Sequence, residues 1–490
     1  MDYLIVAIVA LAAAALGTPF LQVFGQGRAS GYLLIVALLI ALAGVVSNTL
    51  YPQPSGSLGP LFSSDALGDL FAIVTVSVSL FVAVVSLSLV KPSANSPFYY
   101  SLLSFAALGM VLLSYSADLL MLFVSWELMS VPTYALAGFQ KKKEESNEAA
   151  VKYAILGALS SAIILVGISL VYGLTGTTGI FAAAKSLSSQ PFNPVASVAV
   201  VLFIVGFGFK MSVVPFHMWV PDAYEGAPTP IATLFAAGTK KAGFVAAIRV
   251  VLAISTFYAV AEQSSIFSLA NVFAVLAIAT MTLGNFAALT QKSITRLLAY
   301  SSIAQAGYML IGFVIYSYAQ GNPIYAAQGV LGLTGTLFHV VNHSIMKGAA
   351  FVAAGVVVLK LGRGDMAALN GLGRRMPITA FSLTVSLLAL AGVPPLSGFW
   401  SKLILFLSVL NGPYAWLAVA GVLNSALSMG YYGLMIKRMY LDEAEDATQA
   451  REPIPVVVVL AVLVALMIAI GIFPGPVISF SQAAVPSAGP

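Results

Sequence analysis

The chain has 490 residues, of which 60% are apolar and only 8% are charged, and it contains no cysteine. About a quarter of the residues of a soluble domain are charged, so the composition excludes a soluble protein and indicates one that crosses a membrane many times. The missing cysteines exclude disulfides, thiolate metal sites and cysteine-bound iron–sulfur clusters within this chain. The net charge of +5 does not indicate nucleic-acid binding, because the basic residues fall in short loops between apolar runs.

Apolar runs of about 20 residues are long enough to span a bilayer as helices. Fourteen runs pass this test and lack the alternation of a membrane barrel, so the sequence predicts an all-α polytopic membrane protein with about 14 transmembrane helices. No basic segment precedes the first run, and we expect it to be retained as a span rather than removed as a signal peptide. The runs are 2–24, 31–50, 67–91, 98–114, 117–139, 149–173, 196–220, 229–256, 267–289, 294–318, 325–359, 378–409, 413–437 and 454–474.

The basic loop residues predict which side each loop faces, because lysine and arginine favour the cytoplasmic side. With the N-terminus outside, alternate loops collect 15 basic residues inside and only Lys185 outside. This pattern predicts a multi-pass protein of the cell (inner) membrane, embedded in the lipid bilayer, with both termini on the outer side. The inside residues are Arg28, Lys91, Lys141, Lys142, Lys143, Lys152, Lys292, Arg296, Lys360, Arg363, Arg374, Arg375, Lys437, Arg438 and Arg451.

Two spans contain prolines at membrane depth. Four prolines lie between Lys210 and Pro230, and a Pro-Pro pair lies in GVPPLSGFWSK before Lys402. Broken helices at matching places in two halves are typical of inverted-repeat transporters. Because the seventh and twelfth spans are five apart, we predict two inverted five-helix repeats. The predicted regions are 1–97 with the first three helices, 98–256 and 267–437 with the repeats, and 438–490 with an amphipathic connection and the last helix.

One carboxylate, Glu127, lies in the apolar run LLMLFVSWELMSVPTYALAGF, and one ammonium, Lys210, lies in VLFIVGFGFKMSVVPFH. A lone charge in hydrocarbon costs roughly 2.5 to 3.5 kcal/mol on insertion scales. The cost falls if the two groups face each other, so we predict that Glu127 and Lys210 form a pair. A structural ion pair that only fixes helix packing is the alternative.

His339, His343 and Lys347 recur at every fourth residue and therefore share one helix face. A lysine completing the set argues against a metal site, and no metal is predicted; histidines bonded to backbone carbonyls remain an alternative. Proton transfer fits best, because an unperturbed histidine titrates near neutral pH. Farther along the chain, Lys402 follows the second proline break.

Lys240 and Lys241 are adjacent in the eighth apolar run, and neighbours on a helix point about 100° apart, so we expect at most one of them on the inward face. Small polar side chains in nearby runs are candidates either for a water path between the ionisable groups or for contacts between helices. The candidates for this path are His217, Ser302, Gln305, Tyr308 and Asn342.

Six segments together carry a resemblance to a known family: SWELMSVPTYAL, FKMSVVPFHMWVPDAYEGAPTP, KKAGFVAAIR, QKSITRLLAYSSIAQAGYML, HVVNHSIMKG and PPLSGFWSKL. The chain resembles the antiporter-like proton-translocating subunits of respiratory complex I, which are shared with Mrp-type Na+/H+ antiporters and membrane-bound hydrogenases. The matching segments cover most of 115–410. The resemblance implies 14 transmembrane helices with two inverted five-helix repeats.

By motif, Glu127 looks like the family's modulating glutamate of the fifth helix, and Lys210 looks like its partner in the broken seventh helix. Lys240, nine residues before Arg249, matches the eighth-helix lysine, whereas Lys241 does not.

Three further positions look like the central relay of the eleventh helix: His339, His343 and Lys347. Lys402 looks like the twelfth-helix lysine at the proton exit toward the outside. The implied route enters from the inside near His217 and Lys240 and crosses along the membrane midplane.

The resemblance implies that redox chemistry belongs to partner subunits, with no cofactor in this chain and iron–sulfur clusters in peripheral redox subunits. Further antiporter-like membrane subunits are the other implied partners. One paralogue carries a long lateral helix after its last span; here the chain stops at Pro490, and no such helix is expected.

The leading hypothesis is a proton-translocating subunit of a complex I-like oxidoreductase. A standalone Mrp-type antiporter, a membrane-bound hydrogenase, a solute carrier of another inverted-repeat fold and a non-pumping scaffold remain alternatives. Carboxylates are scarce in the spans, which favours protons over sodium as the transported ion. The electron donor and acceptor stay open.

Overall fold

A computed structural model describes residues 3–22, 27–52, 59–90, 93–189, 193–254, 268–444 and 448–486. Lys91, the repeat limits 256 and 267, and the chain ends at Met1 and Pro490 lie outside these residues. The first half of the chain forms α1 (Tyr3–Gly17), η1 (Thr18–Gln22), α2 (Gly27–Leu50), α3 (Ala66–Leu89), α4 (Ser96–Tyr115), α5 (Leu119–Ala137), α6 (Glu144–Thr175), α7 (Ile180–Ser188), α8 (Pro194–Met211), α9 (Val220–Gly226), α10 (Thr229–Leu234), η2 (Phe235–Thr239), α11 (Lys240–Ala247) and η3 (Ile248–Leu252).

The second half forms α13 (Leu269–Leu289), α14 (Ile294–Gly321), η4 (Pro323–Tyr325), α15 (Ala326–Leu361), η5 (Met366–Leu369), α16 (Leu372–Arg375), α17 (Pro377–Ala391), α18 (Ser397–Leu410), α19 (Ala415–Tyr440), α20 (Ile454–Ile472) and α21 (Gly475–Ala483).

Thirteen helical stretches in the described residues are long and apolar enough to cross a membrane. The shorter apolar helices α17 and α18 follow one another across the second proline break and together supply a fourteenth, which confirms the predicted all-α membrane fold. The eighth span, Thr229–Leu252, combines α10, α11 and two π-helical turns, η2 and η3, and its apolar core is buried throughout.

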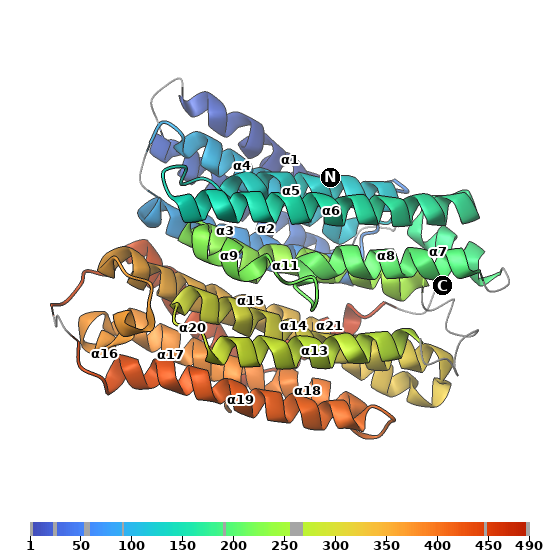
Figure 1. Ribbon diagram of the computed structural model, residues 1–490. Helices are drawn as coiled ribbons and strands as arrows, with labels where there is room; N and C mark the ends of the chain where they lie inside the picture. The colour runs from blue at the N-terminus through green and yellow to red at the C-terminus, as the bar shows by residue number, and fades with distance from the viewer. Residues whose placement is uncertain are drawn as a thin grey trace.

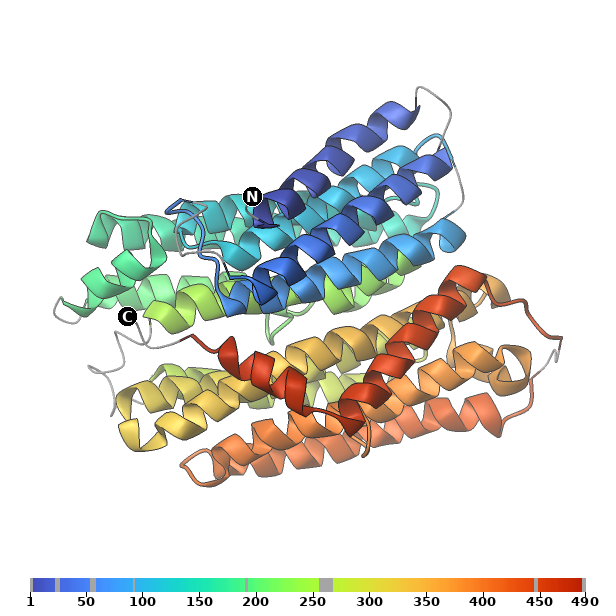
Figure 2. The same ribbon diagram turned by 180° about the vertical axis from the view of Figure 1, so that it is seen from behind.

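Two groups of roughly parallel helices lie side by side (Figure 1). The blue-to-green group holds the first half of the chain, and the yellow-to-red group holds the second. The view from behind shows α20 and α21 crossing over the second group (Figure 2). Contacts of α15 with α10 and η2, and of α20 with α3, join the two groups.

The ends of the helices follow ordinary capping chemistry. Asp118 accepts hydrogen bonds from the amides of Leu120 and Met121 at the start of α5, and the Ser293 hydroxyl accepts one from Arg296 N at the start of α14. At the other end, Gly176 and Gly362 close α6 and α15 in the left-handed conformation, both with φ +70°.

The same backbone hydrogen bonds recur in both halves. A short antiparallel bridge joins Asp118 to Gly179 before α5 and after α6, and an equivalent bridge joins Ser293 to Asp365 before α14 and after α15. At the proline breaks, Val213 N bonds Gly208 O at 2.9 Å and Val393 N bonds Leu388 O at 3.0 Å.

A left-handed residue precedes each of these amides, Ser212 (φ 62°) in one half and Gly392 (φ 90°) in the other. This recurrence supports the predicted division into two repeats, whose limits stay a prediction.

Candidate functional site

Lys210 occupies the last turn of α8, directly before the first break. Its side chain is fully buried, and the ammonium donates to Tyr153 Oη at 2.8 Å and Ser130 Oγ at 3.1 Å. The rings of Trp126, Tyr134 and Tyr153 surround it at 5.8, 5.4 and 4.9 Å. Hydroxyl oxygens and aromatic faces therefore hold this cation in place of a carboxylate.

Glu127 lies one turn before Ser130 on α5 and is half-buried. Its carboxylate accepts a hydrogen bond from Ser161 of α6, and no ion pair joins it to Lys210 among the described residues. The carboxylate still interacts electrostatically with Lys210. The predicted partners are therefore neighbours in one cluster without direct contact.

Lys240 and Lys241 open α11, directly after the π-helical turn η2. Both are buried, because helices enclose the eighth span on all sides, so the expectation that at most one points inward is wrong. Lys240 Nζ donates to the carbonyl and the hydroxyl oxygen of Ser302 at 2.9 and 3.0 Å. Lys241 Nζ contacts His343 Nδ1 on α15.

His339, His343 and Lys347 share one face of α15, and this face contacts α11, α14 and α18. Lys347 Nζ donates to Leu298 O at 2.9 Å and to Ser301 Oγ at 2.7 Å. His339 contacts Ser401 through Nδ1 and Gln305 Oε1 through Nε2, both at 2.9 Å. The rings of His339 and His343 lie 6.1 Å apart between centroids, so the three predicted residues form one row.

Lys402 continues this row beyond the second break. Its ammonium donates to Leu390 O at 2.8 Å, Ala391 O at 3.2 Å and Ser425 Oγ at 2.8 Å, and it lies 4.7 Å from the centre of the Tyr308 ring. Gln305 donates to the same Leu390 carbonyl at 3.1 Å. The break in the helix therefore supplies carbonyl oxygens that hold the cation, and Gln305 links it to His339.

The proposed water-path residues fall into two groups. Ser302, Gln305 and Tyr308 contact the row itself, as described. Asn342 instead donates to Ser397 O at 3.0 Å at the start of α18, which ties α15 to the break. His217 lies in the turn between α8 and α9, is 8% exposed, and interacts electrostatically with Lys240.

An ion cluster lies at the predicted inner ends of the spans. The sequence placed Lys152 and Arg296 on this side but did not predict their partners. Asp222 of α9 accepts from Lys152 of α6 at 2.6 Å and from Arg296 of α14 at 2.7 Å, and Arg296 also reaches Glu225 at 3.1 Å. Burial raises the pKa of Asp222, but the hydrogen bonds from the two cations outweigh it and hold the pKa below its ordinary value. The cluster fixes the segment after the first break against both halves.

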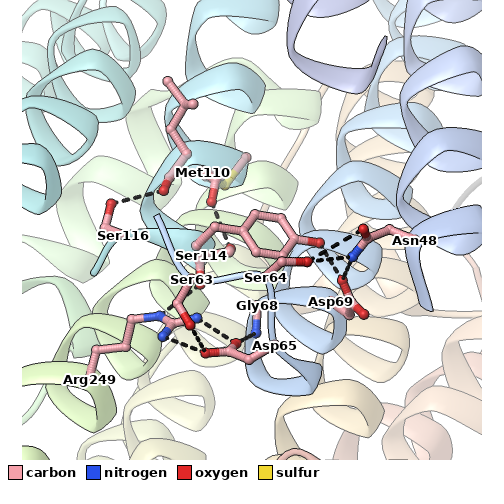
Figure 3. A network of polar contacts seen from close by, with 12 residues as sticks. Asn48, Ser63, Ser64, Asp65, Gly68, Asp69, Met110, Ser114, Ser116 and Arg249 are labelled. Carbon is pink, nitrogen blue, oxygen red and sulfur yellow. Dashed lines mark hydrogen bonds and ion pairs between the residues drawn. The ribbon is translucent and has the colours of Figure 1, made fainter. Parts of the chain in front are cut away.

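A second polar network, at the predicted outer ends, escaped the sequence analysis (Figure 3). Arg249, at the end of the eighth span, makes two hydrogen bonds to the Asp65 carboxylate, at 3.0 and 2.7 Å. Nearby, Asp69 accepts from Tyr115 Oη at 2.7 Å and Asn48 Nδ2 at 2.8 Å. Aspartates near the start of an apolar run gave no signal for pairing with a residue 184 positions away.

The row as a whole holds five lysines and two histidines, and none of the seven makes an ion pair with a carboxylate among the described residues. Buried charges without counter-ions are costly, so the row cannot hold a full positive charge on every member at once. Nor do three or more histidines, aspartates or glutamates gather as a metal site in the described part of the chain. The chemistry that these groups can perform together is proton exchange.

In the described residues, thirteen candidate spans, the shorter helices α17 and α18, two proline breaks and a buried row of lysines and histidines define the class of antiporter-like membrane subunits. F(420)H(2) dehydrogenase subunit N of Methanosarcina mazei is 38% identical over 473 residues, which cover 94% of this chain and 92% of that protein. NADH-quinone oxidoreductase subunit N of Desulfitobacterium hafniense is 38% identical over 462 residues, which cover 93% of this chain and 92% of that protein.

A chain of respiratory complex I from Thermus thermophilus superposes with a TM-score of 0.78 at 30% identity, covering 96% of this chain and 98% of that one. The family profile described as NADH:quinone oxidoreductase/Mrp antiporter, transmembrane, matches residues 116–428. The chain belongs to this family, which confirms the predicted resemblance.

Proposed function

We propose that the chain is the proton-translocating membrane subunit of a complex I-like redox-driven ion pump. The observation that carries this proposal is the buried row from Lys240 to Lys402, in which basic nitrogens contact one another or neutral oxygens. The chain is similar over nearly its full length to subunit N of two oxidoreductases, which supports an assembly driven by redox chemistry.

In this proposal, protons enter from the inside near His217 and Lys240, where the first broken helix opens beside the inner ion cluster. They pass along Lys347, His343 and His339 at mid-membrane, in the order in which these residues lie along α15. Lys402 receives them from the His339 side and releases them outward. Each step moves one proton between neighbouring nitrogens, so the net charge of the row stays low.

Glu127 and Lys210 form the control point in this scheme. While the carboxylate is near, it favours the charged form of Lys210. A neighbouring subunit that moves or neutralises Glu127 removes that support, and Lys210 then passes its proton to the rest of the row. Electron transfer in peripheral subunits carrying iron–sulfur clusters drives this change, and further antiporter-like subunits relay it.

The orientation belongs to the same proposal. Both termini lie on the outer side of the cell membrane, since loop residues such as Lys152 and Arg296 then face inward. An antibody epitope added after residue 486, accessible on intact spheroplasts only when the C-terminus is outside, checks this arrangement.

A standalone Mrp-type antiporter is the second candidate, because the family profile covers both kinds of complex. Mild-detergent purification of the native complex, followed by mass spectrometry of every co-migrating subunit, separates the two. Iron–sulfur subunits support the redox pump. Small membrane subunits without any redox centre overturn it and leave the antiporter.

A further inference from the structure

Lys241 differs from the other lysines of the row in what its ammonium contacts. Lys210, Lys240, Lys347 and Lys402 all donate to hydroxyl or carbonyl oxygens. Lys241 Nζ contacts the basic Nδ1 of His343. It is therefore the lysine of the row whose contact atom is a ring nitrogen that can accept a proton.

The ionisable groups around Lys241 are all basic. Lys240 and Lys347 are the groups that act on it electrostatically, and both are basic. His339 also interacts with it along the row. With no carboxylate among the groups that face it in the described residues, a charged Lys241 is stabilised only through the His343 contact.

The two adjacent lysines diverge toward different helices. Lys240 reaches α14 at Ser302, and Lys241 reaches α15 at His343. The side chain after His343 holds this arrangement: Ser344 Oγ donates to Ala237 O, inside the π-helical turn that precedes the lysines, at 2.8 Å. This hydrogen bond joins the segment before Lys241 to the residue after His343, and it therefore holds the two contacting side chains together.

We propose that Lys241 is a proton-carrying residue that hands the proton from the eighth span to the α15 row, an inference that rests on the proposed function. An N–H bond of the Lys241 ammonium breaks as an N–H bond to His343 Nδ1 forms. Lys241 becomes a neutral amine and His343 an imidazolium, so one proton and one charge move from α11 to α15.

The opposite edge of the His343 ring then continues the transfer. Its Nε2 has no hydrogen-bond partner among the described residues, and the His339 ring lies 6.1 Å away between centroids. A proton accepted at Nδ1 is matched by the release of the proton on Nε2, which leaves the hydrogen on Nδ1; a turn of the ring or a change of tautomer then frees Nδ1 for the next proton. A proton arriving on Lys240 drives the step by repelling the charge on Lys241.

The test uses the complete purified complex in proteoliposomes and measures the rate of proton uptake coupled to electron transfer, together with the number of protons taken up per electron. Four variants are compared: Lys241→Met, Lys241→Arg, Lys241→His and the reference Lys347→Met. The matched control is Lys360→Met, an exposed lysine at the end of the same α15 that carries the row. Assembly of each variant is checked on native gels.

Arginine keeps the charge but cannot release its proton, whereas histidine keeps the titratable nitrogen. The proposal therefore expects Lys241→Met and Lys241→Arg to slow coupled proton uptake by roughly a hundredfold, with substantial recovery in Lys241→His. Normal uptake in Lys241→Arg, with loss in Lys241→His, shows a structural cation and overturns the inference. If Lys241→Met does not assemble, the Arg and His variants, which both stay polar, still decide it.

The reference variant separates the two proposals. Loss in Lys347→Met with normal uptake in all three Lys241 variants overturns the role of Lys241 and leaves the pump intact. Normal uptake in Lys347→Met as well removes the proton route through this subunit altogether.

Discussion

The two broken helices share a backbone and differ in their side chains. Lys210 lies two residues before the left-handed Ser212, and the equivalent position before Gly392 is Leu390. The second half supplies its cation from the far side of the break, where Lys402 reaches back to Leu390 O at 2.8 Å. The same place in the fold therefore holds an ammonium in both halves, delivered from opposite directions.

The partners around the two ammoniums also correspond. Tyr153 and His339 each lie 23 residues before their capping glycines, Gly176 and Gly362. In the first half the position holds a phenol, which only supports Lys210. In the second half it holds an imidazole, whose ring nitrogens can accept and release a proton.

The carboxylate shows the same division. Glu127 lies nine residues after Asp118, and its counterpart nine residues after Ser293 is Ser302. Ser161, which donates to Glu127, corresponds to Lys347, each 15 residues before its capping glycine. In the proposed mechanism, the first half modulates one lysine with a negative charge, and the second half passes protons between basic groups.

Relocating the second lysine to the position of the first tests this equivalence most strongly. We expect Lys402→Met to slow coupled proton uptake by roughly a hundredfold, because the row loses its last proton carrier. The double variant Leu390→Lys, Lys402→Met places an amine at position 390, which is equivalent to position 210 in the first half. We expect it to recover part of the coupled proton uptake in reconstituted complexes. No recovery in an assembled double variant contradicts the equivalence of the two sites.

Removing the charge of Glu127 tests whether the first half controls proton transfer instead of carrying the proton. Glu127→Gln keeps the hydrogen bond with Ser161 but loses the charge, and we expect coupled uptake to fall about tenfold, less than for a row residue. Asp69→Asn is the control, since its carboxylate lies at the predicted outer ends of the spans and contacts Tyr115 instead of a residue of the row. A Glu127→Gln effect equal to that of Lys402→Met places Glu127 in the path itself.

Substitutions of the two left-handed residues at the breaks are expected to change the stability of the fold in opposite directions. Gly392→Ala forces a side chain into φ 90° and brings its Cβ to 3.2 Å from Lys402 Cδ, and we expect a loss of about 1–2 kcal/mol. Ser212→Gly relieves the same conformation in the first half, with a gain of up to about 1 kcal/mol. Thermal unfolding in detergent checks both, and changes of equal sign contradict the comparison.

The ion cluster of Asp222 has no counterpart at the second break among the described residues, and it gives the smallest expected effect. Because the pKa of Asp222 is lowered on folding, its contribution is present at neutral pH and is lost as the pH falls below about 4. We expect Asp222→Asn to lower the melting temperature at pH 7 by an amount equivalent to about 0.2–1 kcal/mol, and to have little effect near pH 3. An equal effect at both pH values shows that the charge contributes nothing.

The sequence predicted the spans, both breaks and every member of the row except Lys241, because charges and prolines stand out in apolar runs. It missed the Lys241 contact, since at most one of the two adjacent lysines was expected on the inward face, whereas the core of the eighth span is buried throughout. The Arg249–Asp65 pair also escaped, because partners distant in sequence leave no local pattern.

The central claim is that protons cross the membrane through the row of this subunit. The most direct measurement is proton uptake per electron in proteoliposomes containing the whole complex with Lys347→Met, compared with the Lys360→Met control. The account predicts that electron transfer continues while proton uptake per electron falls. Unchanged uptake per electron in the assembled Lys347→Met complex contradicts the account.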